Sequence, residues 1–384
     1  MGSGTMAYGA ELITTADDLA SVAARLLDAE AVAVDTEFFW ERTYYPVLGL
    51  VQLAADDGCW LVDAVALRDL RALGPVLAAR GVTKLLHDAP QDLAILARAT
   101  GAMPQTVFDT RVAAGFAGFS STGSLQTLLR DALGIELTKA ETRSDWLRRP
   151  LSEGQLRYAA EDVIHLIPLR AALLARCAGD LPRMWLGEEL ARLDDAALYG
   201  DRDPRLMYQR VKGGSRLDSR PLAVLREAAA WREEEARQRD WPRGHVLPDT
   251  VLVALAEACP RDRAALAALP DFPRRMPDSA TEALLAAVAR GLALPAEACP
   301  QPSGFGLAEK RALRAPSDRL LASICAACEA HGIDPALVAS RSDAESYLLA
   351  RQEGQVADHP LAQGWRARLL ASSAFHRSSM ESEA

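Results

Sequence analysis

The chain has 384 residues, of which 49% are hydrophobic and 25% are charged. This length exceeds what one hydrophobic core usually serves, so we expect two or three domains, and the composition excludes a disordered or fibrous chain. The formal net charge of −9 excludes a uniformly basic nucleic-acid binder, so any such binding must use a local basic surface.

The first half of the chain alternates strand and helix patterns. The predicted strands cover residues 31–35, 48–55, 59–63, 83–87 and 107–108. The predicted helices cover residues 16–29, 66–80, 89–100, 109–117, 124–134 and 152–178. The turn Asp56-Asp57-Gly58 between the second and third strands predicts a hairpin. A hairpin followed by strand–helix alternation indicates an α/β layered domain with a mixed sheet.

The second half of the chain, from about residue 180, is helical in pattern. Apolar residues at three- and four-residue spacing predict a long helix over 220–239, and the helical pattern returns over 317–331 and 336–350. Segments rich in glycine and proline separate these helices. We therefore predict two small helical domains, over about 210–295 and 315–380.

Two pairs of residues each place two functional side chains on one face of a predicted strand or helix. Asp35 and Glu37 are two apart, so in a strand both carboxylates point the same way and repel unless a cation bridges them. Tyr158 and Asp162 are four apart, so they share one face of the last predicted helix of the first half. The alternatives are a solvated strand end for the first pair, and a buried tyrosine beside an exposed aspartate for the second.

A third group lies where the strand 83–87 passes into a helix, a place where α/β folds often put ligand-binding groups. Asp88 is interpreted as the helix N-cap and Pro90 as a first-turn residue. Asp92 lies one turn further on and can face a cleft. His87 is interpreted as a hydrogen-bonded structural residue in preference to a ligand.

Four carboxylates and a tyrosine on three elements suit two divalent ions about 4 Å apart, the arrangement that phosphodiester hydrolysis uses. The chain here resembles the ribonuclease D family, over about residues 12–180. The resemblance rests on VAVDTEFFWERTYYPVLGLVQLA (32–54), LLHDAPQDLAIL (85–96), VFDTRVAAGF (107–116) and YAAEDVIHL (158–166). It implies a ribonuclease-H-like exonuclease domain over 12–195 that trims RNA from the 3′ end with two divalent cations, Mg²⁺ or Mn²⁺.

The resemblance also implies roles for single residues. Asp35, Glu37 and Asp162 are expected to ligate one ion, and Asp35 and Asp92 the second. Tyr158 is expected to orient the attacking water, as in the tyrosine-type branch of this exonuclease superfamily.

The helical half resembles the HRDC domains that follow the nuclease in this family. RPLAVLREAAAWREEEAR through VLPDTVLVALA (220–256) resembles a first copy, and 334–370 more faintly resembles a second. Between the nuclease and the first copy, Arg210, Lys212 and Arg216 form part of a basic stretch that would contact phosphates, unless it is a solvated linker. Phe38 follows the paired acids and would stack on a terminal base, unless it belongs to the core.

We expect a cytoplasmic monomer without an obligate protein partner, and the resemblance implies that it acts on RNA 3′ ends, such as those of tRNA precursors. The six cysteines are scattered, which favours a reducing compartment. No run of 18 or more uncharged apolar residues occurs, so no membrane span is expected, and no signal peptide is expected either. The open alternatives are a DNA 3′→5′ exonuclease and a catalytically weak nucleic-acid-binding scaffold, since only contacts to the 2′-hydroxyl separate RNA from DNA.

Overall fold

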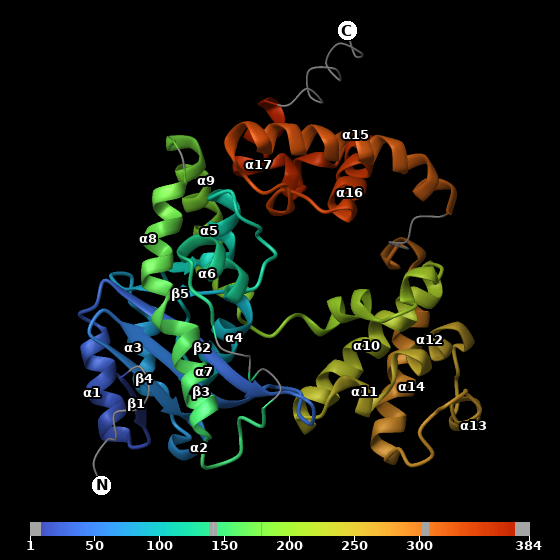
Figure 1. Cartoon of the computed structure of the whole chain (residues 1–384). Helices are drawn as coiled ribbons and strands as arrows, with labels where there is room; N and C mark the ends of the chain where they lie inside the picture. Colours follow the sequence, from blue (N-terminus) through green and yellow to red (C-terminus); the bar gives the residue numbers. More distant parts are fainter. Residues whose placement is uncertain (1–8, 138–140, 142–143, 178, 302–306, 373–384) are drawn as a thin grey trace. The chain divides into compact units, whose positions relative to one another are not determined.

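The computed structural model describes residues 9–137, 141, 144–177, 179–301 and 307–372 (Figure 1). Contacts divide the chain into two compact units. The first unit holds residues up to 39, 48–200 and those from 311 onward. The second unit holds residues 40–47 and 201–310. The segment that follows the strand with the paired acids therefore belongs to the second unit.

The first unit is built on a mixed sheet of six strands in the order β1-β4-β3-β2-β5-β6. The strands are β1 (Ala10–Ile13), β2 (Ala31–Phe39), β3 (Val47–Ala55), β4 (Gly58–Asp63), β5 (Thr83–Leu86) and β6 (Val107–Asp109). The hairpin β3–β4 is antiparallel, whereas β1–β4, β2–β5 and β5–β6 are parallel, so the predicted mixed sheet and hairpin are confirmed. The short edge strand β1 was not predicted.

Helices cover both faces of this sheet. On one face, α1 (Ala16–Leu26), α3 (Gly74–Ala78) and α4 (Pro90–Thr100) enclose a buried core that includes Val32 and Val34 of β2. On the other face, α7 (Glu153–Ile164) and α8 (Leu166–Arg176) contact β2, β4 and β5 (Figure 1). Because side chains alternate along a strand, the same register that buries the two valines turns Asp35 and Glu37 toward α7.

Two predicted helices are broken in the structure. The predicted helix 66–80 is three short turns, α2 (Ala64–Leu67), a 3-10 turn over Arg71–Leu73, and α3. The predicted helix 152–178 stops at His165 and restarts as α8, where Pro168 falls in the first turn and its missing N–H leaves no hydrogen bond unmade. The remaining helices of this part are α5 (Thr110–Phe116), α6 (Leu125–Leu133) and α9 (Asp180–Ala191).

The second unit is a helical module with its own core. Its helices are α10 (Ser219–Arg239), α11 (Arg243–Val246), α12 (Asp249–Ala258), α13 (Arg263–Ala267) and α14 (Asp278–Ala293). The long helix α10 matches its predicted span within one residue. It lies against α14 at Gly291, where a Cβ would come within 2.6 Å of the Val224 Cα.

The C-terminal helices are α15 (Leu307–His331), α16 (Arg341–Gln352) and α17 (Gly364–Ser372). From residue 311 onward they group with the sheet domain, where α17 contacts α9. Trp365 stacks on Trp185 of α9 and meets Phe116 of α5 edge-on. Helix α15 begins ten residues before the predicted helix over 317–331. We call residues 311–372 the C-terminal module. Within the described residues, no helix is both long and apolar enough to cross a membrane.

Candidate active site

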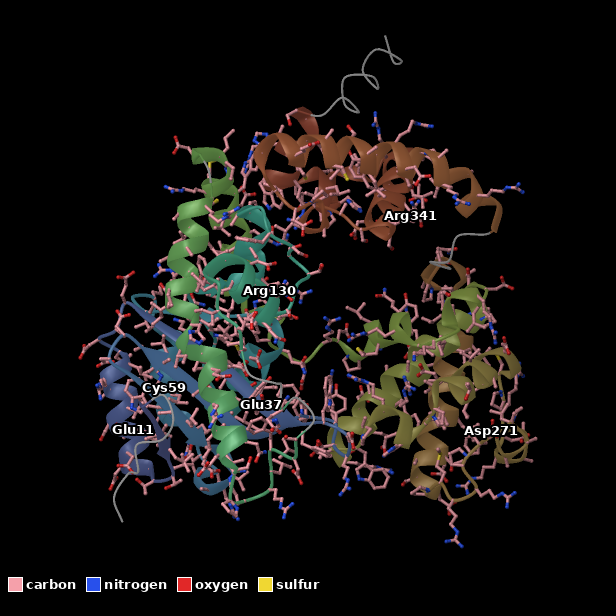
Figure 2. The ribbon with its side chains drawn as sticks, in the orientation of Figure 1. Glu11, Glu37, Cys59, Arg130, Asp271 and Arg341 are labelled. Atoms are coloured by element: carbon pink, nitrogen blue, oxygen red, sulfur yellow. The ribbon has the colours of Figure 1, made fainter. Side chains whose placement is uncertain are left out.

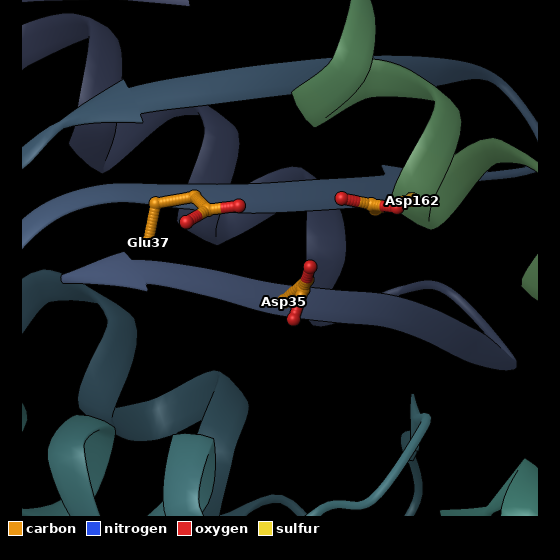
Figure 3. A group of neighbouring side chains, drawn as sticks. All are labelled: Asp35, Glu37 and Asp162. Atoms are coloured by element: carbon orange, nitrogen blue, oxygen red, sulfur yellow. The ribbon is translucent and has the colours of Figure 1, made fainter. Parts of the chain in front are cut away.

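Three carboxylates converge on the α7 face of the sheet (Figure 3). Asp35 and Glu37 come from β2, and Asp162 comes from α7. One oxygen of each lies within 4.8 Å of the others. Figure 2 shows Glu37 against the ribbon of the whole chain. Strand β2 runs on through Phe39, so both acids lie inside the strand, whereas the predicted strand ended at Asp35.

Burial makes this cluster unfavourable without a cation. The pKa of Asp35 is raised well above its usual range, first by burial and then by the charges of Asp92, Asp162 and Glu37. Burial and the charges of Asp162 and Asp92 raise the pKa of Glu37 to about 8. Burial raises the pKa of Asp162 to about 7, although a hydrogen bond from the Tyr158 hydroxyl opposes the shift. Like charges this close disfavour ionisation unless a positive charge joins them.

The residues fit a divalent cation by their chemistry. All three donors are carboxylate oxygens, which Mg²⁺ and Mn²⁺ prefer. Asp162 is only 8% exposed, and its Oδ2 has no hydrogen-bond donor among the described residues. A buried polar atom without a partner is rare in native proteins, and a coordinated ion is one way to satisfy it.

Helix α7 holds Tyr158 and Asp162 on one side. Its start is closed by a capping box, in which the Ser152 side chain accepts from the Gln155 N–H and the Gln155 side chain accepts from the Ser152 N–H. The pKa of Tyr158 is raised, first by burial and then by the charge of Asp162. Its ring lies 6.0 Å from that of Trp146, centroid to centroid. The hydroxyl is therefore a neutral hydrogen-bond donor beside the carboxylates.

Asp92 approaches the cluster from the other side of β2. Among the neighbouring charges it raises the pKa of Asp35 most, yet it stands outside the group of three mutually close acids found among the described residues. Its Oδ1 accepts a hydrogen bond from the Thr36 hydroxyl, whose side chain points opposite to Asp35. Burial raises the pKa of Asp92 to about 6, with the Thr36 bond opposing the shift.

The interpretation of Asp88 as a helix cap was wrong. The N-cap of α4 is Ala89, which has no capping side chain. Asp88 adopts a left-handed backbone with φ 66°, and its carboxylate pairs with Arg111. The first amides are held instead by Asp109 of β6, which accepts from the N–H groups of Asp88 at 3.1 Å and Ala89 at 2.9 Å. The acid that fixes this turn is thus 20 residues away in sequence from Ala89.

His87 is a structural residue, as interpreted. Its Nδ1 lies 3.0 Å from the Thr110 hydroxyl and its Nε2 lies 3.2 Å from the Gly123 carbonyl oxygen. Both ring nitrogens have partners, so neither is available to a metal.

The residues predicted to bind RNA lie in different parts of the chain. Phe38 is half-buried on β2, one position beyond Glu37. Arg210, Lys212 and Arg216 are exposed in the second unit, before α10. Arg216 lies 3.5 Å from Glu257 in a weak surface pair. The RNA-binding role of these four residues stays a prediction.

Two family models match parts of this chain. A family model described as 3'-5' exonuclease matches residues 10–177, and one described as HRDC domain matches residues 222–288. The assignment of the C-terminal module as a second HRDC copy stays a prediction.

Relatives resemble this chain over nearly its whole length. Ribonuclease D from Desulfotalea psychrophila is 40% identical over 372 residues, 94% of this chain and 96% of the relative. Ribonuclease D from Escherichia coli is 32% identical over 94% of this chain and 96% of the relative. Its crystal structure, titled as that of an exoribonuclease involved in structured RNA processing, covers 99% of both chains with TM-score 0.81 and 31% identity. The catalytic core of RRP6 from Trypanosoma brucei shares the fold, with TM-score 0.56 and 24% identity over 74% of this chain and 80% of that one.

Proposed function

The chain belongs to the ribonuclease D family and is a 3′→5′ exoribonuclease, and on this premise we propose that it trims the 3′ ends of structured RNAs, such as tRNA precursors, with two divalent cations. Exonucleases of this family depend on divalent metals, and the acidic cluster is present. The observation that carries the proposal is the convergence of three carboxylates beside a tyrosine, where one carboxylate oxygen has no hydrogen-bond partner among the described residues.

We assign the ligands by their positions. Asp35, Glu37 and Asp162 would hold the first cation, because their oxygens already lie within 4.8 Å of one another. Asp35 and Asp92 would hold the second, because the charge of Asp92 raises the pKa of Asp35 more than any other neighbouring charge does. The cations, when bound, activate the attacking water and stabilise the leaving 3′-oxygen.

The chain's own residues supply positioning. Tyr158 donates a hydrogen bond to Asp162 and would orient the attacking water, since a phenol with a raised pKa is a poor base at neutral pH. Thr36 fixes the rotamer of Asp92 through their hydrogen bond. The scissile phosphodiester would lie beside Asp35, and the 3′-terminal base would stack on Phe38.

The remaining assignments concern substrate and compartment. The basic residues Arg210, Lys212 and Arg216, exposed before the HRDC domain, would contact phosphates upstream of the scissile bond. The six cysteines are all free, which fits the reducing cytoplasm. We keep a monomer as the expected state, without an obligate protein partner.

The test is hydrolysis of matched RNA and DNA oligonucleotides, labelled at the 5′ end, with Mg²⁺, Mn²⁺ or EDTA. We expect stepwise shortening of RNA from the 3′ end with either cation, none with EDTA, and slow or no shortening of DNA. Asp35→Asn, purified in parallel, controls for a contaminating nuclease. Equal rates on both oligonucleotides would contradict RNA specificity, and activity in EDTA would contradict the metal site.

A further inference from the structure

The position of Asp92 depends on the turn that begins α4. That turn carries Asp88 in a left-handed backbone, which side chains other than glycine adopt at a cost. The buried carboxylate of Asp109, 2% exposed, holds the N–H groups of Asp88 and Ala89. Asp92 follows three residues after Ala89, so a shift of this turn moves Asp92 with it.

Arg111 connects this turn to the loop that follows α5. Its backbone N–H donates to Asp109 at 2.8 Å. Its guanidinium pairs with the Asp88 carboxylate and donates through Nε to the Ser121 carbonyl at 2.8 Å. A planar guanidinium with two bonded partners fixes the positions of those partners relative to each other better than a flexible ammonium would.

Ser121 is in turn held by the C-terminal module. Asp334 accepts from the Ser121 N–H at 2.6 Å and from its hydroxyl at 2.8 Å. The Asp334 N–H donates to the Gly115 carbonyl at 2.8 Å. The contact at Gly115 is close, because a Cβ there would come within 2.3 Å of a Leu337 methyl. Ser121 is 7% exposed, so these bonds are shielded from water.

We propose that the C-terminal module is a positioning element of the active site, in which Asp334 acts through Ser121 and Arg111 on Asp88 and so fixes Asp92. We call Asp334, Ser121, Arg111 and Asp88 the support path. The proposal rests on the proposed function, because it requires Asp92 to serve the hydrolysis. It gives the C-terminal module a role other than holding nucleic acid.

The other contacts of this junction support an intramolecular role. Glu189 of α9 pairs with Arg366, and both side chains are largely buried. Glu189 also accepts from the Trp365 indole N–H at 2.7 Å. Glu188 accepts from the Trp365 backbone N–H at 2.7 Å and pairs with Arg368. Trp365, Arg366 and Arg368 of the C-terminal module are thus bonded to two carboxylates of α9.

The first test is the kinetics of Asp334→Ala on a single-stranded RNA oligonucleotide. We expect kcat to fall about tenfold, because a displacement of 1 Å from the productive geometry costs up to about 10²-fold. We expect KM to stay within about twofold and the Mn²⁺ midpoint of activity to rise. A module that held RNA would give the reverse, a raised KM with unchanged kcat, and that result would overturn the proposal.

Asp334→Asn and Arg368→Gln are the companions to this variant. Asparagine keeps a side-chain oxygen for the Ser121 N–H, so Asp334→Asn should restore most of kcat. Arg368→Gln removes a half-exposed pair at the same junction outside the support path, so it should keep wild-type kcat. An equal loss in Arg368→Gln would mean that docking in general, and not this path, supports the site.

A double-mutant cycle covers the case in which Asp334→Ala fails to fold. Ser121→Ala and Asp88→Asn should each lower kcat, and the double variant should lose no more than the worse single one, since both break one path. Additive losses would overturn the proposal. Asp92→Asn separates failure of the proposed function from failure of the support path. Wild-type activity in Asp92→Asn would refute the proposed function itself. A large loss in Asp92→Asn, together with wild-type kcat in the support-path variants, would refute only the support path.

Discussion

The Tyr158 hydroxyl lies among carboxylates that keep it protonated, since burial and the neighbouring acids raise its pKa. Its role is then to orient the attacking water through a hydrogen bond. Tyr158→Phe should lower kcat by about 10²-fold, the low end for a positioned proton-transfer group. The Mn²⁺ midpoint should stay unchanged because Asp162 remains. Wild-type turnover would make Tyr158 a packing residue against Trp146, and a shifted midpoint would place it in the metal site.

Asp35 is the residue that the assigned ligand sets share. Asp35→Asn should lower hydrolysis by at least about 10²-fold, a loss typical of removing one charged group from a preorganised site. RNA affinity, measured by a binding titration in EDTA, should change little, since the residues proposed to bind phosphates lie elsewhere. Asp56→Asn, in the exposed β3–β4 turn, is the matched control and should behave as wild type. Residual activity above a few per cent in Asp35→Asn would refute the assignment.

The raised pKa values predict how pH affects the metal-free protein. Glu37 and Asp162 lose protons near pH 4 when unfolded but near pH 8 and pH 7 when folded. The folded state therefore binds more protons across this window, and the free energy of unfolding should fall as pH rises through it. A bound cation replaces those protons, so Mn²⁺ should raise Tm more at about pH 8.5 than at about pH 6. Equal increments at both values, measured by thermal unfolding against EDTA, would contradict this.

Local sequence patterns identified the acids of the site, but not the residues that hold those acids in position. Two carboxylates two apart and a tyrosine four before an aspartate are visible because helices and strands repeat at fixed periods. Asp88 was misinterpreted because its sequence position suits a cap, whereas Asp109 holds the amides from the neighbouring strand. Thr36 stood between the paired acids, and its side chain faces Asp92 because of the same alternation.

At the scale of elements, the long helices and the hairpin were predictable, and the interruptions were not. The β3–β4 turn carries its own signal in Asp56-Asp57-Gly58, and the pairing followed it. Strand β1 has only four residues, and it pairs with β4, a strand far along the chain. The break at His165 escaped prediction because its neighbours are good helix formers and Pro168 falls inside an otherwise apolar pattern.

Two glycines in helices should respond oppositely to alanine. Gly291 of α14 meets the backbone of α10, where a Cβ would come within 2.6 Å of the Val224 Cα. Gly291→Ala should therefore destabilise the second unit by about 1–3 kcal/mol, as overpacking does. A Cβ added at Gly187 of α9 would meet no described atom within 4 Å, so Gly187→Ala should stabilise by about 0.5–1 kcal/mol. Thermal or denaturant unfolding measures both, and a stabilised Gly291→Ala would show that the helices can separate freely.

At the scale of the whole molecule, the C-terminal helices show what periodicity cannot predict. Their helical pattern was visible, but their partner was not, because an amphipathic helix does not encode which surface covers it. Contacts group them with the exonuclease domain, where Trp365 packs on Trp185 and Phe116. Removing the second half of the chain at residue 195 would therefore uncover this surface, so RNA binding by the helical unit is better tested by surface substitutions.

Because the chain has a net charge of −9, RNA affinity must come from local clusters of basic side chains. Each phosphate contact to a single strand contributes about −0.7 to the slope of log K against log salt. Replacing Arg210, Lys212 and Arg216 together with alanine should weaken binding and flatten that slope by up to about 2, with Arg216 contributing least because it faces Glu257.

A matched triple variant, Arg68→Ala, Arg71→Ala and Arg80→Ala, makes the same change in net charge at exposed positions of the exonuclease domain. If long-range charge alone set the affinity for RNA, both triple variants would bind RNA more weakly by the same factor. Neither slope of log K against log salt would then change much. If the stretch before α10 contacts phosphates, only the first triple variant flattens the slope. Binding titrations of a non-cleavable RNA, in EDTA and over a range of salt concentrations, separate these outcomes. An unchanged slope in the first triple variant would mean that this stretch is a solvated linker.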